Sequence, residues 1–240
     1  FITNALLAEM IGVKIFSAES TLGLEPANLN ILGFTMDFNL TAGAVIWPIV
    51  FITTDLINEY FGKPGVKRIS YFTAFLIAYA FIIIFITIRL SPADFWITAK
   101  DGNGNDFNMD LAFSKIFGQG QRIIIGSLTA FLLGQLVDVF VFQKLRRITG
   151  SKKLWLRATG STLVSQFIDS FVVLFIAFYG VFTNQQIIAI GITNYIYKFT
   201  VAIALTPVIY LGHAWIVQYL GKEQAERISS EAAKGSEGFF

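Results

Sequence analysis

Carboxylate and amide side chains lie inside stretches of this sequence that are otherwise apolar. Gln135 and Asp138 lie three positions apart in one such stretch, and Gln166 and Asp169 have the same spacing in another. This spacing puts both side chains on one face of a helix. A small residue precedes each Gln, so both motifs follow the pattern small-Gln-apolar-apolar-Asp, which indicates an internal repeat. Such groups can pair with the N–H and C=O groups of a polar ligand.

Charged residues inside apolar stretches are costly, so each one indicates a functional site or a buried partner. Asp169 and Lys198 each lie roughly 16 Å from an end of their predicted helices, and therefore near the middle of a bilayer. We expect this pair to act as a central gate or to contact a substrate; a purely structural ion pair is the alternative. The full set that we expect to bind a substrate is Asp169, Gln166, Lys198, Asp138, Gln135, Asp55, Asn58, Glu9, Trp47 and Asn194.

The composition excludes several classes of protein. Hydrophobic residues make up 55% of the 240 residues and charged residues 14%, with a mean hydropathy of +0.64, which excludes an ordinary soluble enzyme. The chain has no Cys and a single His, His213, so disulfides, thiolate metal sites, Cys nucleophiles and His-dependent catalysis are excluded. We predict no enzyme activity, no metal and no cofactor. Nucleic acid is not an expected partner, because the basic residues form no continuous face.

Apolar residues recur in blocks of about 20, the length that a helix needs to cross a bilayer. They predict an all-α polytopic membrane protein with six transmembrane helices, over 1–18, 41–61, 67–89, 121–142, 158–182 and 187–219. Pro207 is expected to kink the last helix. We expect one six-helix transmembrane domain over 1–222 and a polar C-terminal tail over 223–240. The chain begins with Phe1 rather than Met, so we expect residues to precede it in the full protein.

The distribution of Lys and Arg predicts the orientation. Segments 62–68 and 143–157 and the segment after 219 are rich in basic residues, whereas 19–40 and 183–186 have none. By the positive-inside rule, both basic connections and both termini are cytoplasmic. The connection 90–120 is typical of an outer loop with a short surface helix near 107–117.

The helical rise places Asp55, Gln135, Asp138 and Gln166 in the inner half of the bilayer. We therefore expect a polar cavity that extends from the centre toward the cytoplasm. Structural roles are the alternatives for single residues. Gln135 and Gln166 would then join helices by hydrogen bonds, and Trp47 would be an interfacial aromatic residue.

Two further polar residues have simple structural interpretations. Glu59 would lie at the interface or pair with Lys63 four positions later, and His213 would be a packed side chain.

Four groups of residues together form a recognisable pattern. They are Ala42-Gly43 with Trp47-Pro48 and Thr54–Gly62 (TDLINEYFG); Gly134–Phe142 (GQLVDVFVF) followed by Leu145-Arg146; Ser161-Thr162 with Ser165–Ser170 (SQFIDS); and Tyr197-Lys198 with Pro207. Over nearly the whole chain, this pattern resembles the queuosine precursor transporters, also called the vitamin uptake transporter family.

The resemblance implies uptake of a 7-deazaguanine precursor of queuosine, 7-cyano-7-deazaguanine or 7-aminomethyl-7-deazaguanine, across a bacterial inner membrane. A carboxylate can accept the N–H groups of such a base, and a Gln amide can complement its carbonyl. We expect an aromatic lid from Trp47, Phe167 or Tyr195, and excess carboxylates could carry coupling protons. The expected partners are this small molecule, the lipid bilayer and, as one arrangement, a second copy of the chain.

Two other functions stay open at this point. The first is a substrate-binding membrane subunit of a multi-component vitamin importer, which would rely on a separate ATPase; the sequence itself has no Gly-rich phosphate loop ending in Gly-Lys-Ser/Thr. The second is an intramembrane aspartyl enzyme, in which Asp138 and Asp169 would share a proton. The neighbourhood of these residues lacks the glycines that we would expect there.

Overall fold

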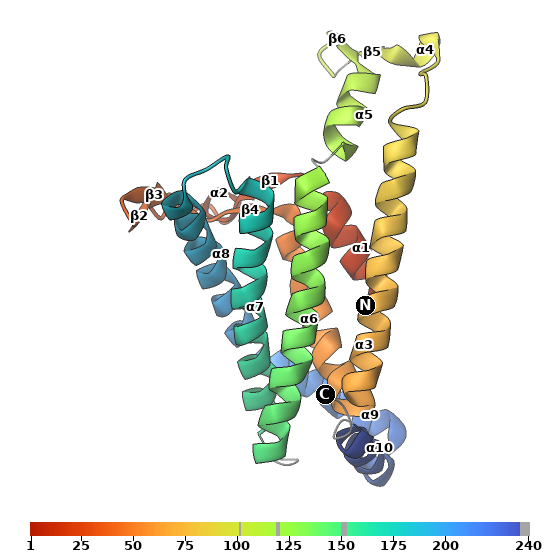
Figure 1. The fold of residues 1–240 in the computed structure, drawn as a ribbon, viewed down its shortest axis with the longest axis vertical. Helices are drawn as coiled ribbons and strands as arrows, with labels where there is room; N and C mark the ends of the chain where they lie inside the picture. Colours follow the sequence, from red (N-terminus) through yellow and green to blue (C-terminus); the bar gives the residue numbers. More distant parts are fainter. Residues whose placement is uncertain (101, 119–120, 150–152, 236–240) are drawn as a thin grey trace.

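The computed structural model describes residues 1–100, 102–118, 121–149 and 153–235, and it is dominated by helices. Among these residues, four helices are long and apolar enough to cross a membrane. They are α3 (Trp47–Thr87), α6 (Gln121–Thr149), α7 (Leu154–Phe178) and α8 (Asn184–Ala204). They form one bundle (Figure 1). The predicted all-α membrane class is therefore confirmed.

Helix α3 is a hairpin rather than one straight rod. Gly62 has φ 63° and ψ −168°, a conformation open essentially only to glycine, and divides α3 into two limbs. Thr54 and Ser70 would lie about 24 Å apart along a straight helix. Their hydroxyls nevertheless both contact Oε1 of Gln135, at 3.3 and 3.5 Å. The two limbs therefore lie side by side. Pro64 falls in the first turn of the second limb, where its missing N–H removes no helical hydrogen bond.

The first predicted helix is too long. Helix α1 (Ile2–Ile11) ends at Gly12, and strand β1 (Ile15–Ser17) pairs antiparallel with β4 (Asn39–Thr41). The prediction of a helix to residue 18 was wrong because the β-branched residues after Gly12 favour an extended backbone, and because Ser17 caps the short helix α2 (Ala18–Thr21).

Small elements gather at one end of the bundle, which we call the strand end (Figure 1). Besides β1, β4 and α2, they are the antiparallel hairpin of β2 (Leu29–Ile31) and β3 (Phe34–Met36), the 3₁₀ turn η1 (Ala42–Val45), α4 (Asp94–Ile97), the antiparallel pair β5 (Thr98–Lys100) and β6 (Asp106–Asn108), and α5 (Met109–Phe117). Helix α5 confirms the surface helix predicted near 107–117. Its first turn is capped by Asn108, which accepts the Leu111 N–H at 2.8 Å.

The last predicted helix is two helices. Helix α8 ends at Ala204, and α9 (Thr206–Leu220) begins beyond Leu205. Pro207 therefore starts a new helix instead of kinking one, because its fixed φ suits a first turn. The polar segment after 222 is helical over α10 (Lys222–Gly235), which packs against α3 and α9.

The other end of the bundle, which we call the basic end, brings together segments far apart in the sequence. It holds the bend of α3, the end of α6, the start of α7, and helices α9 and α10 (Figure 1). These segments carry the residues Lys63, Lys67, Arg68, Lys144, Arg146, Arg147, Arg157, Lys222, Arg227 and Lys234. The connections predicted here are shorter than expected: the bend at Gly62 replaces the loop 62–68, and α6 and α7 extend into 143–157. One reason is that Leu154 is buried with Phe142 in an apolar cluster that lengthens α7.

The bend of α3 gives a direct prediction for stability. Gly62→Ala should destabilise the fold by about 1–3 kcal/mol, because a Cβ strains this backbone conformation. Thermal unfolding of the purified protein in detergent measures the effect. Gly102→Ala is the matched control, since no positive φ is required there and nothing lies within 4 Å of an added Cβ. Equal melting temperatures for the two variants would contradict the assigned bend.

A second prediction concerns Glu19 at the strand end. Its carboxylate accepts the Phe38 N–H at 2.7 Å and the Ser17 hydroxyl at 3.2 Å. The Phe38 hydrogen bond is the main cause that holds the pKa of Glu19 below its ordinary value of 4.5. A lowered pKa in the folded state contributes stability that is present above 4.5 and is lost as the pH falls through the lowered value.

Hydrogen exchange of the Phe38 amide tests this. Relative to the intrinsic rate, protection should hold above pH 4.5 and decline below it. Glu19→Gln should show weak protection with no such pH dependence. An unchanged protection profile in the variant would refute the role of the carboxylate.

Candidate functional site

A cavity of about 670 Å³ lies between α1, the first limb of α3, α6, α7 and α8. At the strand end it is lined by Ile15, Asn39 and Thr41, and toward the basic end it reaches Asp55 and Ile209. Its volume is in the range of pockets that hold small molecules. The cavity thus extends from Asp169 and Lys198 toward the basic end, and it also continues to the strand end, which the sequence did not predict.

Six of the ten residues predicted to bind a substrate line this cavity. They come from four helices: Glu9 (α1), Trp47 and Asp55 (α3), Asp169 (α7), and Asn194 and Lys198 (α8). The structure thus brings together polar side chains that lie up to 189 positions apart in the sequence.

Asp169 and Lys198 form an ion pair in the cavity wall. The Lys198 Nζ lies 2.5 Å from Asp169 Oδ2, and the two side chains are 24% and 22% exposed for Asp169 and Lys198. Asn194 lies one turn before Lys198 on α8 and faces the same space. The pair is therefore within reach of a molecule in the cavity, whereas a buried structural pair would not be.

Another part of the cavity wall combines a carboxylate, Glu9, with aromatic rings. Glu9 accepts hydrogen bonds from the Ser127 hydroxyl, which lies 2.6 Å from each carboxylate oxygen. Trp47 stacks on Phe51 at a centroid distance of 5.8 Å and lies 5.9 Å from Phe131, and all three rings line the cavity. This wall can stack on a planar ligand.

Two residues proposed as an aromatic lid do not line the cavity. Phe167 and Tyr195 contact each other edge to face at 5.4 Å, and the Tyr195 hydroxyl donates to the Leu163 carbonyl at 3.2 Å. Phe167 is half exposed on the outside of the bundle. Of the three expected lid residues, only Trp47 is placed for that role.

Gln135, Asp138 and Gln166 lie behind the cavity rather than in its wall. They surround a small space that Phe51 and Thr162 separate from the main cavity, and this space is too small to hold a water molecule. Gln135 accepts hydrogen bonds from both limbs of α3, as described above, so it does join helices.

The two repeated motifs interlock across the contact between α6 and α7. Ser165, which precedes Gln166, donates a hydrogen bond from its hydroxyl to Asp138 Oδ1, with 3.2 Å between the two oxygens. Gly134, which precedes Gln135, lies so close to Asp169 that an added Cβ would be 3.6 Å from the Asp169 Cβ. The small residue of each motif thus contacts the Asp of the other. This reciprocal contact gives the repeat found in the sequence a structural basis.

Asn58, the remaining predicted site residue, is fully buried below the cavity. Its Oδ1 accepts a hydrogen bond from Gln143 Nε2 at 2.7 Å. The structure does not bring it to the cavity.

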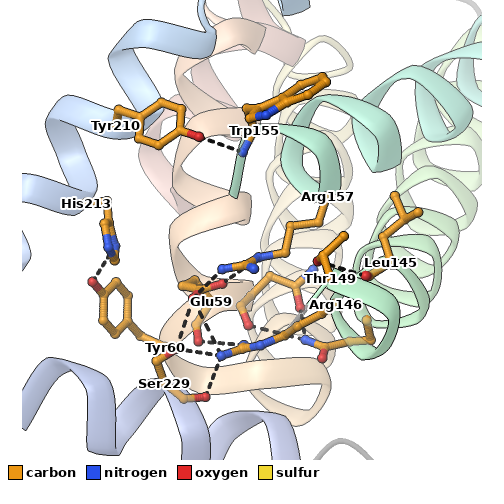
Figure 2. Close-up of polar contacts among 12 residues, drawn as sticks. Glu59, Tyr60, Leu145, Arg146, Thr149, Trp155, Arg157, Tyr210, His213 and Ser229 are labelled. Carbon is orange, nitrogen blue, oxygen red and sulfur yellow. Dashed lines mark hydrogen bonds and ion pairs between the residues drawn. The ribbon is translucent and has the colours of Figure 1, made fainter. Parts of the chain in front are cut away.

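A buried ion-pair cluster around Glu59 lies at the basic end (Figure 2). Glu59 accepts two hydrogen bonds from Arg157, at 3.1 and 2.7 Å, and Arg146 lies 3.5 Å from the same carboxylate. Arg146 also donates to the Glu59 carbonyl at 2.9 Å and to the Ser229 carbonyl of α10 at 2.6 Å. The Ser229 hydroxyl donates to Glu59 Oε1 at 2.9 Å. We call these four residues the basic-end cluster.

The basic-end cluster corrects the interpretation of Glu59 and was missed by sequence reasoning. The Glu59 carboxylate pairs with two arginines from other helices, Arg146 of α6 and Arg157 of α7. Both arginines had been counted only as loop charges that set the orientation. The sequence did contain a signal for this pairing. A carboxylate inside a membrane span needs a cation, and Arg157 follows three apolar residues at the start of a helix. His213 is packed as expected, with its Nδ1 2.6 Å from the Tyr60 hydroxyl.

Comparison with known proteins shows the family to which the chain belongs. Residues 41–212 match a family model described as "Putative vitamin uptake transporter". The chain belongs to the vitamin uptake transporter family. A protein of Bacillus subtilis named "Probable queuosine precursor transporter" is 34% identical over 79% of this chain and 80% of its own length.

Two further relatives agree. The "Queuosine precursor transporter" of Escherichia coli is 32% identical over 73% of this chain and 71% of its own length. A relative in Haemophilus influenzae, named "Probable queuosine precursor transporter", is 30% identical over 74% of this chain and 70% of its length. No solved structure matches. The family resemblance seen in the motifs is confirmed, and this vitamin uptake transporter family member is a transporter and not an enzyme.

The basic-end cluster predicts a large loss of stability when its carboxylate is removed. Glu59→Gln should cost about 3–5 kcal/mol, because two buried arginines lose their counter-charge. The control is Glu231→Gln, which removes an exposed pair with Arg227 and should cost about 1 kcal/mol or less. Denaturant unfolding in detergent compares the two, and a loss of similar size in both variants would show that the cluster is not a buried ion pair.

Proposed function

We propose that this transporter imports a 7-deazaguanine precursor of queuosine across the bacterial inner membrane, with 7-cyano-7-deazaguanine or 7-aminomethyl-7-deazaguanine as its substrate. The printed names of the three relatives support the substrate class. The observation that carries the proposal is the cavity, in which an ion pair, an amide and an aromatic wall face one space of suitable size.

The proposed site uses the cavity residues in distinct ways. Asp169 accepts the N–H groups of the guanine-like edge, and Asn194 complements a neighbouring carbonyl or N–H group. Lys198 holds Asp169 in place and is released toward the substrate when the base binds. The ring of Trp47 stacks on the base. A base without such partners would lose its hydrogen bonds to water, so these residues would select the substrate.

We propose that the two limbs of α3, α6, α7, and α8 with α9 cross the membrane, and that α1, about 15 Å long, lies in the half nearer the strand end. The basic end is then cytoplasmic, since most of the basic residues lie there, and the C-terminal helix α10 belongs to that side. The part of the cavity lined by Ile15, Asn39 and Thr41 then lies on the outer side, and the basic-end cluster closes the cytoplasmic side. Import requires that the cluster separates after the strand end has closed over the substrate.

Binding to the purified protein tests the site. Asp169→Asn should weaken the binding of either 7-deazaguanine by about tenfold or more, because one charge-assisted acceptor is worth roughly 1.5–3 kcal/mol. Substrate-induced thermal stabilisation and direct titration measure this. Asp94→Asn, an exposed carboxylate on α4, is the control and should bind like the unmodified protein.

Uptake by the chain alone in liposomes, without ATP, completes the test. Equal affinity in Asp169→Asn would remove Asp169 from the site, and the absence of any binding by the unmodified protein would refute the proposed substrate class.

A further inference from the structure

Two buried carboxylates, Asp55 in the wall of the cavity and Asp138 behind it, have no cationic partner among the described residues. Asp55 is 2% exposed and Asp138 is 5% exposed. Oδ1 of Asp55, Oδ2 of Asp138 and the nearby Oε1 of Gln166 accept no hydrogen bond from the residues that the structure describes. Asp138 lies close enough to Asp55 for the two charges to interact. Asp138 and Gln166 line the same small space, and Asp55 lies at the cavity side of it.

The charged groups around this pair are already engaged. Glu59, one turn below Asp55 on α3, is held by Arg157 of α7 and Arg146 of α6. Asp169 of α7 is held by Lys198 of α8.

The remaining titratable neighbours are also accounted for. Glu9 of α1 accepts from Ser127, and His213 of α9 lies against Tyr60. Within 1–100, 102–118, 121–149 and 153–235, no Lys or Arg forms an ion pair with Asp55 or Asp138.

Two adjacent carboxylates in such surroundings cannot both stay ionised, because neither water nor a fixed cation offsets their charge. A bound metal cation needs several oxygen ligands around a space of its own. The space that Asp138 shares with Gln135 and Gln166 is too small for even one water molecule. A proton needs no such space, and it turns one carboxylate into the donor that the orphaned acceptors lack.

We propose that Asp55 and Asp138 together bind the proton whose entry drives import. This inference rests on the proposed transport function. Asp55 lines the cavity, so a proton from the outside reaches it first, and Asp138 lies directly behind it.

The interlocked repeat allows the two aspartates to be compared. Asp169 and Asp138 occupy matching places in the two motifs. The charge of Asp169 is balanced by a fixed cation, Lys198. In the proposal, the charge of Asp138 is balanced by a proton, which can be exchanged.

The same geometry explains coupling. When the strand end closes, water leaves the cavity and the ionised pair becomes more costly. The protonated pair tolerates closure. The transporter therefore closes readily only with a proton bound, and the proton leaves when the basic-end cluster opens to the cytoplasm.

Liposomes containing the full chain test the proposal. With the outside more acidic than the inside, external 7-deazaguanine should be accumulated, and a pH-sensitive dye inside should record proton entry that depends on the substrate. Exchange of labelled for unlabelled substrate is measured at equal pH. Asp138→Asn should lower accumulation by about tenfold or more, with exchange preserved within about threefold.

Two further variants separate a coupling role from a folding defect. Asp138→Glu restores the carboxylate and should recover pH-driven accumulation in part. Asp94→Asn, exposed on α4, should accumulate substrate like the unmodified protein.

The outcomes are distinguishable. The inference is overturned if the unmodified protein moves no protons with the substrate, if accumulation follows a sodium gradient instead, or if Asp138→Asn accumulates substrate undiminished. None of these results affects the proposed function. A protein that neither binds nor exchanges any 7-deazaguanine would refute the proposed function itself.

Discussion

An ionised side chain inside a bilayer persists only where another group compensates its charge, and this constraint orders the whole structure. Down the bundle axis, four carboxylate sites meet it in four ways. Glu9 accepts a hydrogen bond from Ser127, Asp169 pairs with a lysine, Asp55 and Asp138 have no cationic partner among the described residues, and Glu59 pairs with two arginines. On α6, Asp138 is about 16 Å below Ser127 and about 12 Å above Arg146, so the sites form separate tiers.

The carboxylate sites differ in burial, and this difference separates the buried ion pairs that hold helices together from the pair that can contact a ligand. Arg157 and Glu59 in the basic-end cluster are almost completely buried, and the cluster ties α3, α6, α7 and α10 together. The pair of Asp169 and Lys198 is about one quarter exposed and faces the cavity. A buried, multiply bonded cluster suits a closed barrier, whereas a hydrated pair can exchange its partner for a ligand.

The scaffold that holds these tiers is the contact of α6 with α7, the most extensive contact between helices. Small residues make it possible: an added Cβ at Gly126 would lie 3.2 Å from the Val173 carbonyl, and Gly134 and Ser165 accommodate the aspartates of the opposite motif. The bend at Gly62 folds α3 back along this pair, so that both its limbs contact Gln135. One glycine thus places the second limb of α3 beside the first.

The sequence by itself determined the membrane class, the family, the approximate position of most helices and the polar residues worth attention, because hydrophobic periodicity and the cost of intramembrane charge are local properties. Only the tertiary structure decided which of those residues meet. Asp169 and Lys198 come together as expected, but Asn58 and the glutamines lie outside the cavity, and Glu59 pairs with Arg157, 98 positions away in the sequence. Pairing across helices depends on their rotation and on the bend at a single glycine, which no spacing within one helix encodes.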